Sequence, residues 1–315
     1  MTATHSQNID VRIEDRDGQR IAHVAIDNRG RLNSLNSALM AQFVERIESL
    51  SRDDGLRAVV LSGAGGKAFV GGADIDEMAA LGDETRARAF ITSVHRVCNA
   101  VRDCPVPVIA RIQGYTLGAG LELAAACDLR VAAEGSHFGM PEVRLGIPSV
   151  VEAALLPGLV GWGRTREMLL VGDNFGADEA LRIGLVERVV PADGLDAVID
   201  GWLAGLLANG PQSVRLQKQL IRRWENLPMR EAVQAGIDAF GQAWRGPEPA
   251  AMMSGFLEAR RQRRAAGGAA SPAAPPPDVS SAAASPAAPS SATASIPTSA
   301  ASPSTQRSSN DGDTR

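Results

Sequence analysis

The chain has 315 residues, 44% hydrophobic and 22% charged, which is enough to bury the core of one or two domains. Its formal net charge of −4 gives no basic field for nucleic acid or an anionic membrane. The first residues lack the basic start and apolar run of a signal peptide, and no apolar stretch is long enough to cross a bilayer. We therefore expect a cytoplasmic protein without a nucleic-acid partner or a membrane span.

Strand and helix signals alternate along the first two thirds of the chain. Residues 11–15 and 21–26 flank the turn sequence Arg16-Asp-Gly-Gln and predict a hairpin. A glycine-rich loop spans 63–72. Helices are expected at 37–50, 83–103 and 118–126, and short buried strands at 56–61, 106–112 and 129–132. Because strands separated by helices imply crossovers, the pattern predicts an α/β fold with much parallel pairing.

After Pro191 the strand signals end and helical signals take over. Helices are expected at 195–207, 211–225, 229–244 and 249–264. A helical block of this kind, with its own apolar faces, often packs on a partner subunit. Residues 265–315 are rich in Ala, Ser and Pro and contain no aromatic residue, which predicts a disordered tail. Residues 1–10 are expected to be a flexible N-terminus.

Nucleotide chemistry lacks its usual motifs in this sequence. The loop Gly63-Ala-Gly-Gly-Lys-Ala-Phe has glycines too close together for a phosphate loop, and no Ser or Thr follows Lys67. No GxGxxG fingerprint follows a predicted strand. The sequence therefore favours neither nucleotide hydrolysis nor hydride transfer.

Two glycine-containing turns precede helical segments. Gly71 and Gly72 come directly before Ala73, and Gly118 comes directly before Ala119. Each turn alone also fits an ordinary strand-to-helix connection. The first amides of a helix are unpaired donors at its positive end, so the amides of Ala73 and Ala119 together predict an oxyanion hole.

Two glutamates are the candidate acid and base. Glu122 lies one helical turn past Ala119 in an otherwise apolar segment, and Glu142 directly follows Pro141. Their structural alternatives are a surface glutamate and a helix-capping carboxylate. A carboxylate on an apolar face is costly unless it is paired or used, and two carboxylates in one apolar pocket do not easily both ionise. We predict that the two meet and divide acid and base roles.

The remaining reactive side chains lack a recognisable arrangement. His23, His95 and His137 are scattered without ligand spacing, which favours structural roles and predicts no metal site. Ser149 lacks a nucleophile elbow. The cysteines, Cys98, Cys104 and Cys127, also lack metal spacing and are expected to fill core space.

The chain from about residue 11 to residue 264 resembles the crotonase superfamily, the enoyl-CoA hydratase/isomerase family. Five segments carry the resemblance: residues 28–36, 69–75, 114–123, 138–148 and 180–191. They resemble the family's early coenzyme A-binding turn, its two oxyanion segments, its second acid site and the end of its core.

The resemblance implies a spiral of ββα repeats over 11–194, with helices over 195–264 closing a homotrimer or a dimer of trimers. It implies an acyl-CoA thioester as substrate and neither metal nor redox cofactor, since coenzyme A is part of the substrate. The amides of Ala73 and Ala119 would hold the thioester oxygen. The residue matching Glu122 activates water for attack at Cβ, and the residue matching Glu142 delivers a proton to Cα.

The resemblance also implies a coenzyme site. Backbone around Gly71, Asp74 and Ile75 would contact adenine and pantetheine, and Arg31 stands where the family often has lysine near the phosphates. Asp76 replaces a basic residue that many hydratases have there.

The pocket segments depart from the family pattern as well. Ala119 replaces a common glycine, whose amide it retains. The stretch Ile147-Pro-Ser-Val-Val-Glu-Ala replaces a glycine-rich turn, so Pro141, Ser149 and Glu152 become candidates for the acyl pocket. Glu152 fits either a third pocket acid or a helix N-terminal charge.

The first functional hypothesis is a 2-enoyl-CoA hydratase. The alternative is another crotonase reaction, namely isomerisation, decarboxylation or thioester hydrolysis, because one oxyanion hole serves them all. A non-catalytic acyl-CoA-binding protein is disfavoured because both glutamates are present. RNA binding is disfavoured because the helix at 37–50 has Arg46 as its only cation beside Glu45 and Glu48.

Overall fold

Two sheets form the framework of the protein. The computed structural model describes residues 7–265; those up to Ala259 form one compact unit, and those from Arg260 onward belong to a second. Among the described residues the larger sheet has six strands in the order β1-β2-β3-β5-β7-β10, and the smaller has four in the order β4-β6-β8-β9. The hairpin pairs antiparallel and the rest of the larger sheet is parallel, which confirms the α/β prediction.

The larger sheet consists of β1 (Asn8–Arg16), β2 (Gln19–Asp27), β3 (Leu56–Gly63), β5 (Val108–Ile112), β7 (Leu129–Ala133) and β10 (Arg188–Val190). The smaller sheet consists of β4 (Ala68–Val70), β6 (Tyr115–Leu117), β8 (His137–Gly139) and β9 (Phe175–Gly176). Because β3, β5 and β7 are each followed by their smaller-sheet partner in the same spatial order, the chain winds as a spiral of ββα units.

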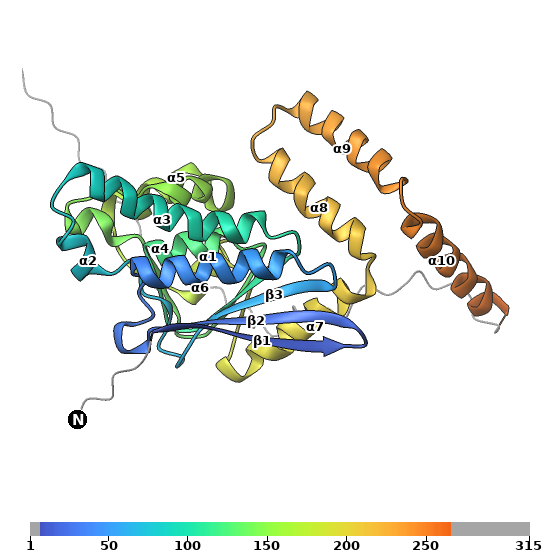
Figure 1. Ribbon diagram of the computed structural model, residues 1–315, viewed down its shortest axis with the longest axis horizontal. Coiled ribbons are helices and arrows are strands. Elements are labelled where there is room, and N and C mark those ends of the chain that lie inside the picture. Colours follow the sequence, from blue (N-terminus) through green and yellow to red (C-terminus); the bar gives the residue numbers. More distant parts are fainter. Residues whose placement is uncertain (1–6, 266–315) are drawn as a thin grey trace, which may run out of the picture. The chain divides into compact units, whose positions relative to one another are not determined.

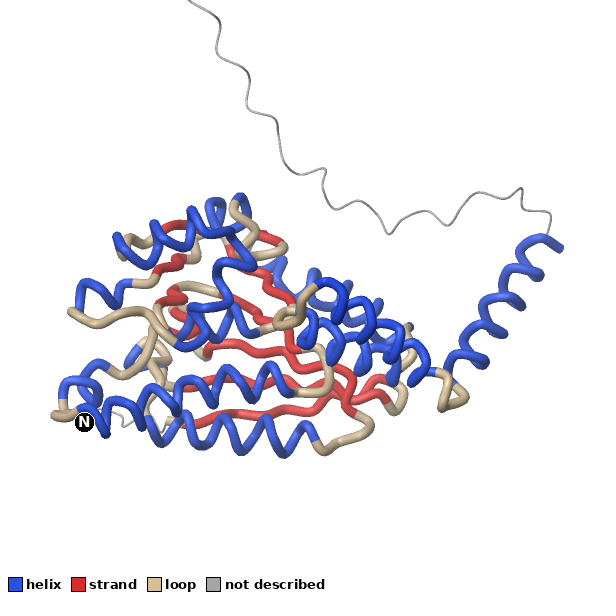
Figure 2. The backbone as a smooth tube through the Cα atoms, turned by 90° about the horizontal axis from the view of Figure 1, so that it is seen from above, coloured by secondary structure: helices blue, strands red, loops and turns tan. Residues whose placement is uncertain are grey.

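Helices cover both faces of the larger sheet (Figure 1). One face of β2, with Ala22, Val24 and Ile26, packs in the main core under α1 (Ser37–Ser51), α3 (Glu84–Asp103) and α4 (Ala119–Ala126). The alternate residue Ile21 faces α7 (Leu195–Ala208) on the other side. Figure 2 shows the strands in red between these helical layers. The alternation follows from the two-residue period of a strand.

The remaining helices are α2 (Ile75–Ala79), α5 (Leu156–Val171), α6 (Ala177–Arg182), α8 (Pro211–Trp224), α9 (Met229–Ala243) and α10 (Glu248–Ala265). Short 3₁₀ turns are η1 (Arg29–Arg31), η2 (Pro141–Leu145), η3 (Val151–Leu155) and η4 (Ala192–Gly194). The four helices expected after Pro191 are all present. Within the described residues no helix is both long and apolar enough to cross a membrane.

Several features differ from the sequence expectation. Strand β1 begins at Asn8, so residues 8–10, which we assigned to a flexible N-terminus, pair with β2. Helix α7, assigned to the region that meets a partner subunit, packs through Leu195, Ile199 and Leu203 on the chain's own sheet. The short strands β4, β6, β8, β9 and β10 were not predicted, because two or three residues do not display a period. The tail prediction lies outside the described residues from 266 onward.

Candidate active site

One small cavity brings together the two predicted turns and the two predicted glutamates. It has a volume of about 100 Å³ and lies between the segment after β4, helices α2 and α3, the start of α4, the turn η2 and the segment that follows it. Its lining residues are Gly71, Gly72, Ala73, Ile75, Met78, Ile91, Val94, Leu117, Gly118, Ala119, Glu122, Pro141, Glu142, Leu145, Ile147, Pro148 and Val150. Apart from the two carboxylates, these side chains are apolar or absent.

The backbone leaves the amides of Ala73 and Ala119 unpaired. Beside Ala73, the Gly72 carbonyl accepts from the Leu35 amide at 2.9 Å, with Gly72 at φ +119°. Ala119 opens α4 after Gly118, which has φ +51° and therefore favours glycine. Over residues 7–265, no protein acceptor lies within hydrogen-bond distance of the Ala73 or Ala119 amide. Both residues line the cavity, so two free donors border one space.

Glycines allow these turns to approach each other. A Cβ atom at Gly120 would lie 2.0 Å from the Val70 carbonyl oxygen at the end of β4. A Cβ atom at Gly118 would lie 2.4 Å from Oε1 of Glu142. Both distances are far below van der Waals contact, so side chains at these positions would push apart the elements that carry the free amides and the carboxylates.

Glu122 is a buried carboxyl group at the base of the cavity. Its residue is 3% exposed, and its Oε1 accepts a hydrogen bond from the Ala153 amide at 3.1 Å. Burial, and then the nearby charge of Glu142, raise the pKa of Glu122 to about 8, against the lowering effect of the Ala153 amide. At neutral pH the empty cavity therefore holds a proton on Glu122.

Glu142 occupies a more polar position at the cavity wall. It is the second residue of η2, directly after Pro141, and is half-buried. Its Oε2 accepts a hydrogen bond from the Ser149 hydroxyl at 2.7 Å, and its Oε1 faces Gly118. The two glutamates thus meet as predicted, in environments that differ enough to separate an acid from a base.

The candidate acyl-pocket residues take different positions. Pro141 lines the cavity, whereas Ser149 lies behind Glu142 as its hydroxyl donor. Glu152 is buried in η3 and does not line the cavity; its Oε1 lies 2.8 Å from Nδ1 of His95. Neither sequence interpretation of Glu152, pocket acid or helix-terminal charge, describes this buried pair with a histidine of α3.

The candidate coenzyme residues gather at the cavity mouth, but Asp74 is occupied. Gly71 and Ile75 line the cavity. The Asp74 side chain caps α2, its amide donates to Leu35 and its carbonyl accepts from Met78, so little of its backbone remains for a ligand.

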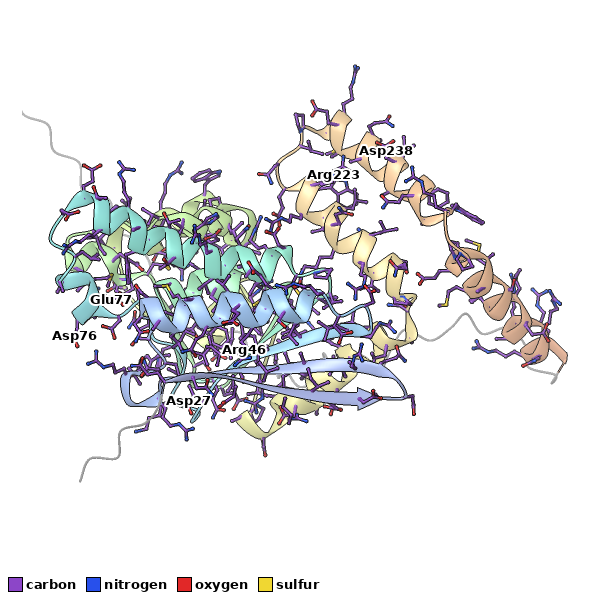
Figure 3. All side chains as sticks on the ribbon, viewed as in Figure 1. Asp27, Arg46, Asp76, Glu77, Arg223 and Asp238 are labelled. Atoms are coloured by element: carbon purple, nitrogen blue, oxygen red, sulfur yellow. The ribbon has the colours of Figure 1, made fainter. Side chains whose placement is uncertain are left out.

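Arg31 is held by two acids at this mouth. Its Nη1 lies 3.0 Å from Asp74 Oδ2 and 2.7 Å from Asp76 Oδ2. Figure 3 labels Asp76 and Glu77 on α2, at the surface of the molecule. Asp76 is thus the direct partner of the residue expected near the phosphates.

Sequence reasoning missed two contributors to the site. The Ala153 amide donates a hydrogen bond to Glu122, and His95 contacts Glu152. Neither contact has a local sequence signal, since the partners lie 31 or more residues apart.

The other two histidines considered in the sequence fit structural roles: His23 pairs with Glu14, and His137 stacks on Tyr115. All three cysteines are buried and form no disulfide, and the described residues contain no cluster of three His, Cys, Asp or Glu suited to a metal.

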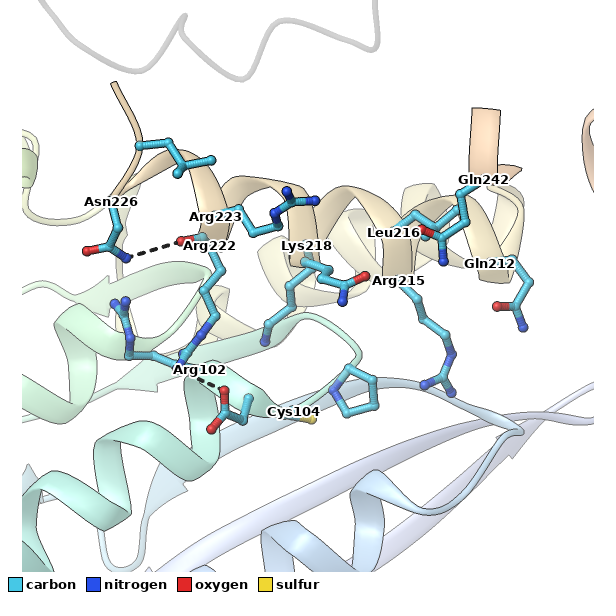
Figure 4. A pocket seen from close by; sticks show the side chains of 14 residues that line it. Arg102, Cys104, Gln212, Arg215, Leu216, Lys218, Arg222, Arg223, Asn226 and Gln242 are labelled. Carbon is cyan, nitrogen blue, oxygen red and sulfur yellow. Dashed lines mark hydrogen bonds and ion pairs between the residues drawn. The ribbon is translucent and has the colours of Figure 1, made fainter. Parts of the chain in front are cut away.

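A larger cavity of about 750 Å³ lies between α8, α9 and the end of α3 (Figure 4). Three of its five cationic side chains are ion-paired: Arg102 with Glu225, Arg222 with Asp103, and Lys218 with Asp128. It contains neither glutamate of the acid–base pair. The small cavity is therefore the candidate active site.

Comparison with known proteins identifies the family. A family model described as enoyl-CoA hydratase/isomerase matches residues 16–263. The chain belongs to the enoyl-CoA hydratase/isomerase family. It is 35% identical over 243 residues to the short-chain-enoyl-CoA hydratase of Clostridium acetobutylicum, covering 77% of this chain and 93% of that relative. It is 34% identical to the crotonyl-CoA hydratase of Syntrophomonas wolfei, covering 77% and 94%.

Solved structures of the enoyl-CoA hydratase/isomerase family share this fold. The crystal structure of an enoyl-CoA hydratase from Bacillus anthracis superposes with a TM-score of 0.75 at 32% identity, covering 80% of this chain and 96% of that one. The corresponding structure from Mycobacterium smegmatis also gives 0.75, at 29% identity. The spiral of ββα units expected from the resemblance is thus confirmed.

Proposed function

We propose that this protein is a 2-enoyl-CoA hydratase, which adds water across the double bond of an acyl-CoA thioester. The observation that carries the proposal is the single apolar cavity bordered by two free amides and two carboxyl groups. The two relatives named short-chain-enoyl-CoA and crotonyl-CoA hydratase, each covered over more than nine tenths of its length, support it.

The two free amides polarise the thioester. Water is a poor nucleophile toward an alkene, but conjugation lets charge flow from Cβ to the thioester oxygen as attack proceeds. The amides of Ala73 and Ala119 receive that oxygen. Fixed donors in an apolar space require no reorganisation when the charge develops, and removing one such donor typically costs about 3 kcal/mol.

The glutamate pair works with one proton. Hydration needs a carboxylate that takes a proton from water and a carboxylic acid that gives one to Cα, so the competent pair is singly protonated. In the resemblance Glu122 is the base and Glu142 the acid, but burial places the proton of the empty cavity on Glu122. Either the proton passes to Glu142 as substrate enters or the two residues exchange roles, and both routes require the same singly protonated pair. This chemistry requires no metal and no redox cofactor.

The size of the cavity favours a short acyl chain. Its volume is about 100 Å³. Met78, Ile91 and Val94 are among its apolar walls, so a longer chain would have to displace packed side chains. We therefore propose a substrate whose acyl chain has about four carbons. The names of the two relatives, short-chain-enoyl-CoA hydratase and crotonyl-CoA hydratase, agree with this size.

We propose a homotrimer, or a dimer of trimers, closed by the last helices. Helices α9 and α10 expose large apolar side chains that a soluble monomer rarely leaves in water, among them Met229, Val233, Ile237, Phe240 and Phe256. The residues of α9 form one face because they recur at three- and four-residue spacing. Size-exclusion chromatography with light scattering tests this assembly.

The decisive experiment adds purified protein to crotonyl-CoA and follows the loss of enoyl-thioester absorbance, with mass analysis of the product. A product heavier by one water establishes hydration. The variants Glu122→Gln and Glu142→Gln should each lose turnover by at least two decades while retaining acyl-CoA binding. A near-normal rate in either variant contradicts the two-carboxyl mechanism. Acyl-CoA binding without a water adduct would instead point to isomerisation, decarboxylation or thioester hydrolysis.

A further inference from the structure

A second buried carboxylate lies behind the cavity and is bound to a histidine. Glu152 is 6% exposed, and its Oε1 lies 2.8 Å from Nδ1 of His95. Its other oxygen, Oε2, is buried and has no hydrogen-bond partner among the described residues. His95 lies on α3 with its side chain half exposed, so solvent reaches one end of the pair.

A buried carboxylate with one free oxygen is unfavourable without a compensating partner. Desolvation of an unpaired charge costs several kcal/mol, and breaking a buried pair leaves that cost uncompensated. Within the described part of the chain, His95 places a ring nitrogen on Glu152, and the Cys98 thiol interacts with the same carboxyl group. Because the thiol is neutral, the histidine is the partner that can balance the charge of a buried Glu152 carboxylate.

The same turn holds Glu122 through its backbone. Ala153, the residue after Glu152, donates its amide to Glu122 Oε1 at 3.1 Å. Turn η3 packs against both α3 and α4, the helices that carry His95 and Glu122. A displacement of η3 would therefore move the donor away from the catalytic carboxyl group.

The turn adopts this conformation against a local preference. Val151 has φ +38°, a left-handed conformation that is rare and unfavourable for a β-branched residue. Such a conformation persists only where surrounding contacts hold it. Among the described residues, η3 is held by its packing against α3, α4 and α5, by the His95–Glu152 pair and by the Ala153–Glu122 hydrogen bond.

We propose that His95 and Glu152 are positioning residues for Glu122: the imidazole holds the buried Glu152 carboxylate, and so keeps η3 in the conformation in which the Ala153 amide binds Glu122. This role rests on the proposed hydratase function of Glu122. It assigns to a histidine outside the cavity an effect on the rate of the chemical step.

Charge also connects the pair to Glu122. The groups that face Glu122 are Glu142 from η2, Glu152 and the Ala153 amide from η3, and Cys98 from α3. Burial, followed by Glu152 and Glu122, raises the pKa of Cys98 well above its ordinary value, so this thiol stays neutral. Glu142 and Glu152 both raise the pKa of Glu122, so loss of the Glu152 charge favours ionised Glu122.

The test compares two substitutions of Glu152 in the full-length protein. Glu152→Ala removes the contact with His95 and should lower kcat for crotonyl-CoA by roughly ten- to a hundredfold with KM changed little, because it misplaces Glu122. Glu152→Gln keeps a hydrogen bond to His95 and should restore most of kcat. Because it lacks the charge, Glu152→Gln should also move the alkaline limb of kcat/KM to lower pH.

The chain provides a matched control. His23 and Glu14 form a pair of the same type, also 2.8 Å apart, on the β1–β2 hairpin away from the cavity. Glu14→Ala should leave kcat and its pH profile unchanged. His95→Ala should reproduce the effect of Glu152→Ala, since either change breaks the same contact.

A second measurement separates this proposal from the proposed function. Titration of the Glu122 side chain by carbon-13 NMR in the free protein should show its pKa shifted down in Glu152→Gln, whether or not the protein hydrates crotonyl-CoA. An unchanged Glu122 titration in Glu152→Gln would contradict the charge coupling, and a kcat within twofold of wild type in a folded Glu152→Ala would overturn the positioning role. If Glu152→Ala does not fold, the kcat and the Glu122 titration of His95→Ala decide, because that change breaks the same contact.

Discussion

The backbone amide of Ala153 donates a 3.1 Å hydrogen bond to Oε1 of Glu122, and both groups are buried. Because the two residues are 31 positions apart, this contact links the turn η3 to helix α4, which carries the candidate acid–base residue Glu122. An amide donor favours the ionised form of a carboxyl group, but burial and the charge of Glu142 outweigh it here. The result is a carboxyl group that keeps its proton at neutral pH.

We expect activity to fall on the alkaline side of about pH 8. The competent pair carries one proton, and burial and Glu142 raise the pKa of Glu122 to about 8. Above that pH Glu122 loses the proton that the pair needs, so kcat/KM should drop about tenfold per pH unit. A profile of kcat/KM for crotonyl-CoA between pH 6 and 10 measures this limb. Constant activity up to pH 10 would refute the shared-proton pair.

The same carboxyl group should make stability depend on pH. Its pKa is raised in the folded state, from 4.5 to about 8, so the folded protein binds the extra proton. The stabilisation is therefore fully present below pH 4.5 and is lost as pH rises through about 8, amounting to a few kcal/mol. Chemical denaturation of wild type and Glu122→Gln across this range should show a smaller decline for the variant. Parallel curves for the two proteins would be inconsistent with this linkage.

Asp76 should weaken coenzyme binding. It pairs with Arg31 at 2.7 Å and is 79% exposed on its side chain, so it competes with an incoming phosphate for the same guanidinium. Because an exposed ion pair contributes only about 0–1 kcal/mol, Asp76→Ala should lower KM for crotonyl-CoA by roughly two- to fivefold without changing kcat.

Two controls test whether Asp76 competes with a coenzyme phosphate for Arg31. The KM for crotonyl-pantetheine, which lacks the nucleotide phosphates, should not respond to Asp76→Ala. Arg31→Ala should raise KM for crotonyl-CoA. If KM for crotonyl-CoA were unchanged in both Asp76→Ala and Arg31→Ala, the coenzyme phosphates would not bind at Arg31.

Lys218 should be important for stability rather than for catalysis. Its buried ammonium group donates to the carbonyls of Val101 and Val106 and lies 2.6 Å from Asp128 Oδ2. Figure 4 shows this side chain extending from α8 toward the segment that contains Cys104. Removing one partner of a buried pair leaves the other uncompensated, so Lys218→Met should cost about 3 kcal/mol of unfolding free energy. Urea denaturation measures this loss.

The double variant Lys218→Met/Asp128→Asn tests the cause. Replacing the charge on Asp128 should recover part of the lost stability, because no uncompensated carboxylate remains. Additive losses in the two single variants and the double variant would show that the two side chains act independently. Residual hydratase activity per folded molecule should be unchanged, since neither residue lines the small cavity.

Local sequence patterns determined most of the elements. Helical periodicity over 37–50 and 83–103 and the apolar strands around Leu56 and Val108 depend on neighbours within a few residues, so they were predictable. The meeting of Glu122 and Glu142 at one cavity was also predictable. An unpaired carboxylate on an apolar helix is energetically unfavourable, so its presence in the sequence indicates a specific role. The short strands of the smaller sheet were not, since their hydrogen-bond partners come from distant turns of the spiral.

Tertiary structure alone decided how the site is tuned. The composition of the segment Ile147–Ala153 indicated an unusual pocket turn, but not that Val151 would be left-handed or that Glu152 would face His95. Those outcomes depend on α3 packing beside η3, a contact between residues 57 positions apart. The sequence by itself therefore identified the candidate groups for the chemistry, because charge and apolar context are local. Burial, the pKa of Glu122 and the partners of Glu152 arise only when distant segments exclude water together.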